Sequence, residues 1–419
     1  MKHNLNHAFV WDNDAFTTNL FGHPYHGGLY FNAARSNGMN FYESIPYIVA
    51  GSLMWEYLME NEPPSINDFI STPIGGIALG EITFRISDLL IDNNTSGLNR
   101  FSRELLAGII SPMRGLNRII NGDAWKVRNV KRTFPEFPEN IPVNFNIITG
   151  YGVLIDNANK KIANNGMYID LGLTYNCLFS DDNEKPYDAF VVRAAFNFFS
   201  GQPVIRNINI IGQLWGENIH LKNEKIIAHW GFFQHFDYHN LNPIFGENTV
   251  KPYRISETAA YGIGIQLKTK SKKTVTSAFA AYLNAVLLGG YITDYYQVLE
   301  RDYNMGSGFS VKINSQLLFG AKTSLVVGLA NYRVFSWKGY SPEINLSRLT
   351  HEEQLNLNVQ GDKGNVSFTI CNLKFKYCFR KHCLFSMETS YYMRNSTYKY
   401  FPDTKYGIME SKLGLEYTF

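Results

Sequence analysis

Three histidines and one aspartate fall on alternate positions of one segment of the chain, HWGFFQHFDYH at residues 229–239. A period of two places His235 and Asp237 on the same side of a strand, together with His229 and His239. A histidine beside a carboxylate can exchange protons near neutral pH, and three histidines with an aspartate could equally bind a metal ion. A polar barrel interior would explain the same residues without any chemistry. The opposite side carries four aromatic residues: Trp230, Phe232, Phe236 and Tyr238.

A second group of polar residues lies near the N-terminus, where Asn13 and Asp14 precede the sequence HPYHG at residues 23–27. Asparagine and aspartate supply the oxygen ligands that calcium prefers, so these two residues are the predicted metal ligands. His23 and Tyr25 are predicted binding residues. His26 is predicted to join His235 and Asp237 as a catalytic residue, which requires the fold to bring the two segments together. The alternative is a simple turn, since segments rich in Asn, Asp and Gly often reverse the chain.

A third group consists of charged and amide side chains in predicted helices. Buried carboxylates need partners, so a structural network is expected, with a substrate-binding seam as the alternative. Glu81 and Arg85 are spaced to pair along one helix face. The predicted binding residues of this group are Glu56, Asn67, Asp68, Glu81 and Arg85.

The elements that carry these residues change in type near residue 140. From there to residue 419, long segments alternate apolar and polar residues and end on Phe419. Their lengths match or exceed the roughly 9 to 11 residues with which a tilted strand crosses a bilayer. We therefore predict a mainly β fold, an antiparallel transmembrane β-barrel of twelve strands, with a soluble β-sandwich binding protein as the alternative. The segments are 144–156, 165–177, 187–199, 203–216, 224–236, 256–268, 273–288, 305–319, 322–336, 364–379, 383–396 and 406–419.

Residues 1–139 are predicted to form a separate helical domain, with 140–419 forming the barrel. Helices are expected over 40–60, from the capping residue Ser65 to about 91, and over 99–120 with a break at Pro112. Gly76 and Gly80 should let another backbone approach closely. These helices are too polar for lipid and too apolar for water. A plug in the barrel lumen or a cap on its periplasmic mouth is therefore predicted, with an independent helical domain as the alternative.

Composition bounds the remaining possibilities. Charged residues make up 18% of the chain and the net charge is only +3, so no nucleic-acid partner is predicted. The four cysteines have no metal-binding spacing, and pairing of Cys378 with Cys383 across a turn is left open. The N-terminus lacks the apolar core of a signal peptide, and we expect that a signal has been removed. The expected location is the bacterial outer membrane, with its lipids and lipopolysaccharide as partners.

Four segments resemble an uncharacterised family of bacterial outer-membrane proteins, whose N-terminal part is a domain of unknown function (DUF 3943). The resemblance is specific over residues 11–92 and looser in the barrel. It implies a location in the cell envelope and brings no activity. The segments are HPYHGGLYFNAARSNGMNFYES (23–44), GSLMWEY (51–57), PPSINDFISTPIGGIALGE (63–81) and QHFDYHN (234–240).

An NDxF segment followed by PYxGxLY is also similar to the lipid A 3-O-deacylase family, which are twelve-stranded barrels that use calcium and a histidine base. This chain departs from that pattern at His23 and His26, inserts a long helical region, and lacks the later histidine motif. Three functional classes therefore stand: a structural barrel with a helical plug, a transporter, and a calcium-assisted lipid A or phospholipid deacylase. The matching positions are Asn13, Asp14, Pro24, Tyr25, Gly27, Leu29 and Tyr30.

Overall fold

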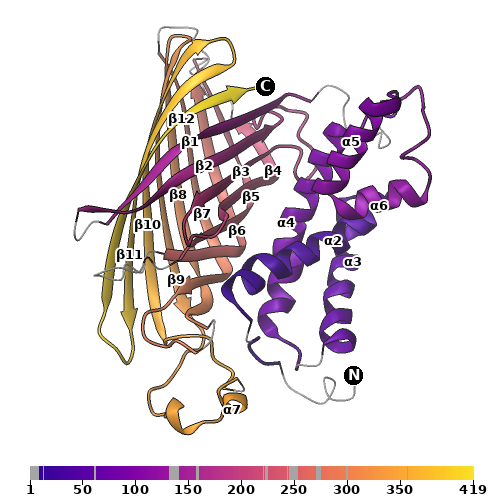
Figure 1. Ribbon diagram of the computed structural model, residues 1–419. Coiled ribbons are helices and arrows are strands. Elements are labelled where there is room, and N and C mark those ends of the chain that lie inside the picture. The colour runs from indigo at the N-terminus through magenta and orange to yellow at the C-terminus, as the bar shows by residue number, and fades with distance from the viewer. Residues whose placement is uncertain are drawn as a thin grey trace. The chain divides into compact units, whose positions relative to one another are not determined.

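The chain forms two compact units, Met1–Ile141 and Pro142–Phe419, the first helical and the second built from strands (Figure 1). The computed structural model describes residues 9–12, 14–60, 63–131, 141–156, 160–219, 221, 225–242, 244, 253–269, 275–298, 301–355 and 357–419.

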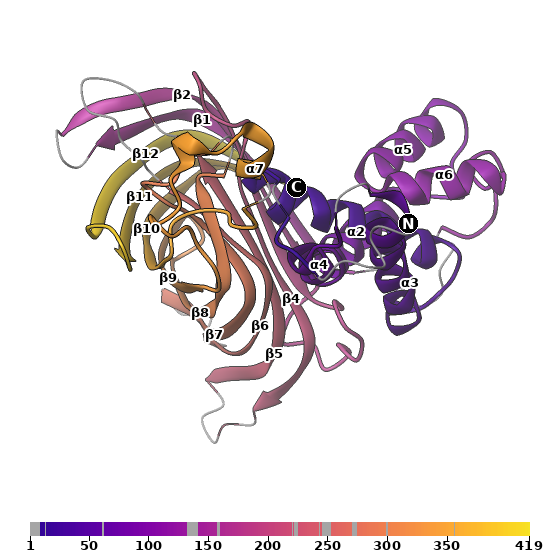
Figure 2. The same ribbon diagram turned by 90° about the horizontal axis from the view of Figure 1, so that it is seen from below.

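The second unit is a closed antiparallel barrel (Figures 1 and 2). Each strand pairs with its neighbours in sequence, and β1 pairs with β12 to close the sheet. The predicted twelve-stranded barrel is confirmed, and the sandwich alternative is wrong because the single sheet closes on itself. The strands are β1 (Val143–Asp156), β2 (Lys161–Tyr175), β3 (Phe190–Phe199), β4 (Ile205–Ile219), β5 (Ile226–Leu241), β6 (Tyr253–Thr269), β7 (Val275–Ile292), β8 (Tyr303–Phe319), β9 (Thr323–Ser336), β10 (Gly364–Arg380), β11 (Cys383–Tyr398) and β12 (Thr404–Thr418).

Side chains alternate between the outside and the inside of the barrel, as the period of two predicts. On β12, Leu413 and Leu415 are 52% and 58% exposed, whereas Glu410, Lys412 and Glu416 are buried. An apolar exterior around a polar interior is the pattern of outer-membrane barrels. On β5, Trp230 and Phe232 are exposed as predicted, but Phe236 and Tyr238 are buried. The prediction of a lipid-facing side therefore holds only for the first half of that strand.

Among the later strands the connections differ in length between the two barrel ends, whereas residues 176–189 separate β2 from β3 at the end where the chain terminates. Three residues separate β8 from β9 and two separate β10 from β11, at the end where the chain terminates. The connection from β9 to β10 runs over residues 337–363 and contains η3 (Leu346–Arg348) and α7 (His351–Leu355) at the opposite end. Cys378 and Cys383 flank the short β10–β11 turn as free thiols.

The barrel interior is packed at the end with long connections. Side chains from nine strands form one buried cluster, which we call the lumen core. Because its members come from all around the barrel, the cluster crosses the lumen. Its members are Leu154, Phe199, Leu241, Tyr253, Ile255, Tyr291, Tyr332, Val334, Val366, Phe368, Tyr392 and Ile408.

The first unit holds five α-helices and two π-helical segments among its described residues. Each predicted helix is present, and the break at Pro112 separates α5 from α6 as expected. Among the described residues, none of the helices combines the length and apolar character needed to span a membrane. The elements are η1 (Thr18–Gly22), α2 (His23–Ser36), α3 (Phe41–Met54), η2 (Trp55–Met59), α4 (Ile66–Leu90), α5 (Gly97–Ile110) and α6 (Pro112–Ile120).

Helix α2 is the element that the sequence interpretation missed, because the segment HPYHGG suggested a turn. Pro24 stands in the first helical turn, where its missing N–H costs nothing. The glycines serve packing instead of chain reversal: a Cβ at Gly76 would lie 2.7 Å from the backbone of Gly27. A Cβ at Gly80 would come within 3.2 Å of Gly28. The close approach predicted for Gly76 and Gly80 is confirmed, with α2 as the partner of α4.

Candidate functional site

Residues 9–12 bring an acidic side chain to the start of α4. Val10 and Ser65 form a parallel β-bridge, in which the Val10 amide donates to the Pro64 carbonyl and the Ile66 amide donates to the Val10 carbonyl, both at 3.0 Å. Ser65 is also the N-cap of α4. The bridge therefore fixes Asp12 beside the first turn of that helix.

Two π-helical segments position side chains in the same region. Segment η1 leads directly into α2, so His23 is the first residue after it, and η2 ends the run of α3 and carries Glu56. Both side chains are buried. Wide π turns occur often at functional sites, because the extra residue in the turn redirects neighbouring side chains.

The imidazole of His23 faces three carboxylates, and we call these four side chains the His23 cluster. Its Nε2 atom lies 3.5 Å from Asp68 Oδ1, 3.7 Å from Asp14 Oδ2 and 3.9 Å from Asp12 Oδ2. Burial alone would lower the pKa of His23, but the carboxylates, Asp68 foremost, outweigh burial and raise it to about 9. His23 is therefore the positive charge that faces these acids at neutral pH.

Asp68 is held in place by its neighbours on α4. The Ser65 hydroxyl donates to Asp68 Oδ2, and the Asp68 amide donates back to the Ser65 oxygen at 3.1 Å. Asn67 Nδ2 donates to Asp68 Oδ1 at 2.8 Å, while Asn67 Oδ1 accepts from the Asp12 amide at 3.0 Å. Burial raises the pKa of Asp68 to about 7, against the opposing effect of His23. Asn67 thus links the backbone of Asp12 to the carboxylate of Asp68.

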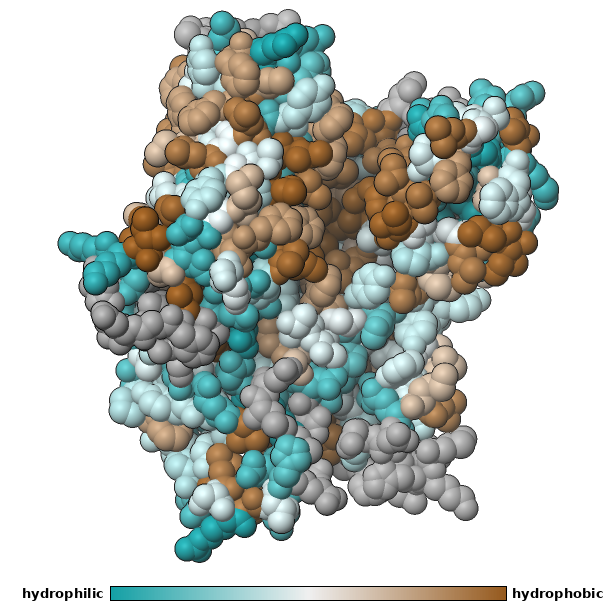
Figure 3. Space-filling model, viewed as in Figure 1, coloured by the Kyte–Doolittle hydropathy of each residue, from teal (hydrophilic) through white to brown (hydrophobic). Residues whose placement is uncertain are grey.

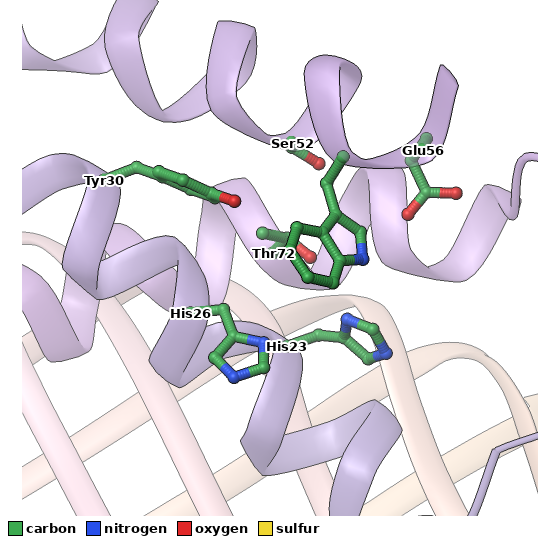
Figure 4. A pocket seen from close by; sticks show the side chains of 7 residues that line it. His23, His26, Tyr30, Ser52, Glu56 and Thr72 are labelled. Carbon is green, nitrogen blue, oxygen red and sulfur yellow. The ribbon is translucent and has the colours of Figure 1, made fainter. Parts of the chain in front are cut away.

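A small hollow adjoins the cluster, and Figure 4 shows its lining side chains. Its volume is about 10 Å³, which is about the space of one water molecule. Glu56, whose Oε2 accepts the Ser65 amide at 2.7 Å, has its pKa raised by burial to about 8. Burial, then the charge of His23, lowers the pKa of His26. The hollow suits a water molecule or an ion. It is lined by His23, His26, Tyr30, Ser52, Trp55, Glu56 and Thr72.

Glu81 and Arg85 form a structural network elsewhere on α4. The predicted pair is present, with Arg85 Nε 2.7 Å from Glu81 Oε1. Arg35, which the sequence interpretation did not select, adds a two-pronged contact to the same carboxylate at 2.8 and 3.1 Å. Two guanidinium groups lower the pKa of Glu81 despite its burial. This carboxylate is fully satisfied, and the network ties α2 to α4.

His235 and Asp237 lie in the barrel interior, where Lys312 stands between them. Lys312 Nζ contacts Asp237 Oδ2 and Glu257 Oε2, each at 2.6 Å, and lies 3.2 Å from His235 Nδ1. We call these four residues the Lys312 cluster. The predicted acid–base pair is therefore interrupted by an ammonium group, and the histidine faces a cation where a carboxylate was expected.

The remaining predicted lumen residues are bound by hydrogen bonds. Tyr332 donates to Asp237 at 2.8 Å, and Asn209 Nδ2 donates to the same carboxylate at 2.9 Å. Asn209 also lies 3.1 Å from His239 Nε2, and His229 Nδ1 lies 3.1 Å from Asn218 Oδ1. These contacts are compatible with a hydrogen-bonded barrel interior.

The structure brings some of the predicted N-terminal residues together and leaves others apart. Asp14, His23 and Asp68 come together, with Asn67 as a supporting residue. Tyr25 is 42% exposed and does not line the hollow. Asn13 lies outside the described residues. Asp12 was missed, although it stands in the same acidic run WDND, because the NDxF pattern drew attention to residues 13 and 14.

The model of one family matches the helical part of the chain. It is the Domain of unknown function (DUF3943), over residues 8–113. The match covers α2 to α5 and every member of the His23 cluster. No curated protein matches the sequence, lipid A 3-O-deacylases included, so that similarity stays a prediction.

Several solved barrels are similar to this chain at low identity. The NanC porin has 10% identity and a TM-score of 0.32, covering 65% of this chain and 98% of its own. An outer membrane channel from Pseudomonas putida F1 has 7% identity and a TM-score of 0.31, covering 67% and 97%. The KdgM porin in complex with disordered oligogalacturonate has 10% identity and a TM-score of 0.28, covering 65% and 99%. The barrel assignment rests on the strand pairing of this chain itself.

Proposed function

We propose that the protein is an integral barrel of the bacterial outer membrane with a structural role, which holds its helical unit at the membrane and conducts no solute. The apolar exterior of the strands supports the membrane location, since such a surface needs lipid to cover it. The long strands and the contrast between short and long connections also support an outer-membrane barrel. The proposed partners are therefore outer-membrane lipids and lipopolysaccharide.

The observation that carries the structural role is a bridge of side chains across the lumen. Arg206 on β4 pairs with Glu410 on β12, and its guanidinium donates to the hydroxyls of Tyr253 and Tyr392 at 2.8 Å each. Tyr253 on β6 and Tyr392 on β11 stack with ring centroids 4.5 Å apart. Strands β4 and β6 lie across the barrel from β11 and β12 in the strand order. A lumen filled in this way favours an anchor over an open channel.

The bilayer conductance of the purified protein tests this role. Full-length protein in planar lipid bilayers is expected to give no steady conductance. Changing Tyr253, Phe368 and Tyr392 together to alanine removes three large members of the lumen core and should create conductance. A matched triple change on the outside, Leu413→Ala, Leu415→Ala and Met387→Ala, should leave the bilayer sealed. Steady conductance by the unchanged protein would contradict the proposal.

The membrane location has its own test. The protein should fractionate with washed outer membranes and migrate differently on gels before and after heating. Leu413→Arg places a charge on the exposed apolar face and should cost about 2 to 4 kcal/mol of folding stability in lipid vesicles. Full solubility without detergent would refute the location.

For the helical unit, we propose a cap on the periplasmic side of the barrel in preference to a plug inside it. The packed lumen core supports this choice, because it leaves little interior space at one end. The apolar surface of α5 and α6 also supports it, since exposed patches of this kind mark interaction surfaces (Figure 3). Residues at least half exposed there include Leu98, Phe101, Leu105, Ile109 and Ile120.

Cysteine cross-linking distinguishes the two arrangements. Cysteines placed at Leu98 or Ile109 should cross-link to cysteines in the short turns, such as Lys322, in intact cells. Cross-links to lumen positions on β8 or β12 in their place would favour the plug. A barrel that forms unchanged beside a separately folded and dissociated helical fragment would exclude both.

A further inference from the structure

We infer that Asp12, His23 and Asp68 bind one divalent transition-metal ion, zinc or manganese, with Asp14 at the rim of the site. This binding site goes beyond the structural role of the barrel. It is complete within the helical unit, so it stands or falls independently of barrel conductance.

The spacing of the polar atoms is the first observation. His23 Nε2 lies 3.5 to 3.9 Å from the three carboxylate oxygens, which is too long for good hydrogen bonds. Ligand atoms held at about 2.0–2.2 Å from one ion lie roughly 3 to 4.4 Å from each other. The candidate ligand atoms of Asp12, His23 and Asp68 all lie within 4.8 Å of one another. These separations suit atoms that share an ion better than atoms that share protons.

The burial of the imidazole is the second observation. The His23 side chain is only 9% exposed, and its Nε2 atom points at the carboxylates without a hydrogen-bond partner. Buried polar atoms nearly always have a partner, so such an atom needs an explanation. A metal ion supplies one, because it can displace the imidazole proton, and the neutral imidazole nitrogen is a common metal ligand.

The donor types decide the class of ion. One imidazole with carboxylates matches the ligands of zinc, while carboxylates also suit manganese. Calcium prefers a shell made of oxygen atoms, usually six to eight of them. The donor types therefore favour a transition metal over the calcium ion that the sequence suggested. Three carboxylates also supply enough negative charge to balance a dication.

The surroundings of the ligands fit a metal site. Asn67 accepts the Asp12 amide and donates to Asp68, so one side chain orients two ligands. Ser65 fixes the second oxygen of Asp68. Supporting contacts of this kind orient metal ligands and commonly change affinity by about 10- to 100-fold. Asp14 is 49% exposed and gives the site an open side through which an ion can enter.

Metal binding by the purified full-length protein in detergent tests the inference. After chelation and dialysis, zinc and manganese are titrated by calorimetry, and manganese is also followed by electron paramagnetic resonance. One ion per chain is expected. His23→Gln and Asp68→Asn should each weaken binding by at least about 100-fold, and Asn67→Ala by about 10- to 100-fold. His351→Gln removes an exposed imidazole in the β9–β10 connection of the barrel and should leave the affinity unchanged.

Folding of each variant is checked by heat-dependent gel migration and circular dichroism. Only variants that match the unchanged protein in both are compared, and Asp12→Asn replaces Asp68→Asn if the latter fails. The inference is overturned if the protein binds neither metal. It is equally overturned if His23→Gln binds as well as the unchanged protein, or if calcium alone binds.

Discussion

The two units of the molecule each bury a histidine among carboxylates, but they neutralise the carboxylates differently. In the Lys312 cluster an ammonium group lies at the centre, 2.6 Å from two carboxylates. In the His23 cluster the imidazole itself is the cation, and its contacts are 3.5 Å or longer. Short contacts to a built-in cation complete a structural network. Longer contacts around a group that can lose its proton leave a place where an ion can compete.

Removal of Lys312 is the strongest way to test this contrast. Lys312→Met should destabilise the barrel by about 3–5 kcal/mol, because two buried carboxylates lose their shared partner. Unfolding in urea from lipid vesicles measures the change. Lys322→Met in the exposed β8–β9 turn is the control and should change stability little. If the two variants are equally stable, the Lys312 cluster is not a structural network.

The stability of the helical unit should depend on pH, because its buried cluster is held together by protons that can be lost. The pKa of His23 is raised to about 9, and burial raises those of Asp68 and Glu56 to about 7 and 8. For all three groups the folded state binds protons more tightly than the unfolded state. The contribution of His23 is thus complete below about pH 6.5 and is lost as the pH rises through 9. Asp68 and Glu56 also lose their stabilising contribution as the pH rises, and this loss begins at a lower pH than that of His23.

Hydrogen exchange of the metal-free full-length protein measures this effect without separating the units. After correction for intrinsic exchange rates, peptides from α2 and α4 should lose about 1–3 kcal/mol of protection between pH 6 and pH 9.5. His23→Gln should remove the share of the loss that is due to His23 and leave the share due to Asp68 and Glu56, while His26→Gln should retain the whole loss. Protection that rises with pH would show that the assigned proton affinities are wrong.

How far the sequence predicts these two regions depends on the range of the contacts. Strand positions follow from a local period of two, so all twelve predicted segments overlap real strands. Lys312 lies 77 residues from His235, and only the register of the closed barrel brings them together. The pairing register between distant strands cannot be read from the alternation of residues within one strand. The polar face of β5 was therefore predictable, whereas the ammonium group that changes its chemistry was not.

The helical unit shows the same limit. Capping by Ser65 and the break at Pro112 depend on local residues and were predicted correctly. Helix α2 was missed because Gly27 and Gly28 indicate a turn locally, while in the fold they allow contact with α4. Asp12 reaches the site through a β-bridge that joins Val10 to Ser65. Pairing between such distant short segments leaves no periodic signal.

The smallest effect is expected for Asp68→Asn. The amide keeps the size of the side chain, and Ser65 can still bond to it, so the helical unit should lose only about 1 kcal/mol. The larger response should be in His23, because Asp68 is the strongest of the carboxylates that raise its pKa. Burial then dominates, and the pKa of His23 should fall toward or below its ordinary value of 6.5.

Nuclear magnetic resonance of the labelled imidazole, in the metal-free full-length protein, can follow that titration directly. Asp14→Asn is the matched control, since it removes a half-exposed carboxylate and should lower the pKa of His23 less. A smaller fall for Asp68→Asn than for Asp14→Asn would mean that the exposed carboxylate governs the imidazole. The buried pair would then resemble the Lys312 cluster, a network whose charges are already matched, and the difference between the two regions would disappear.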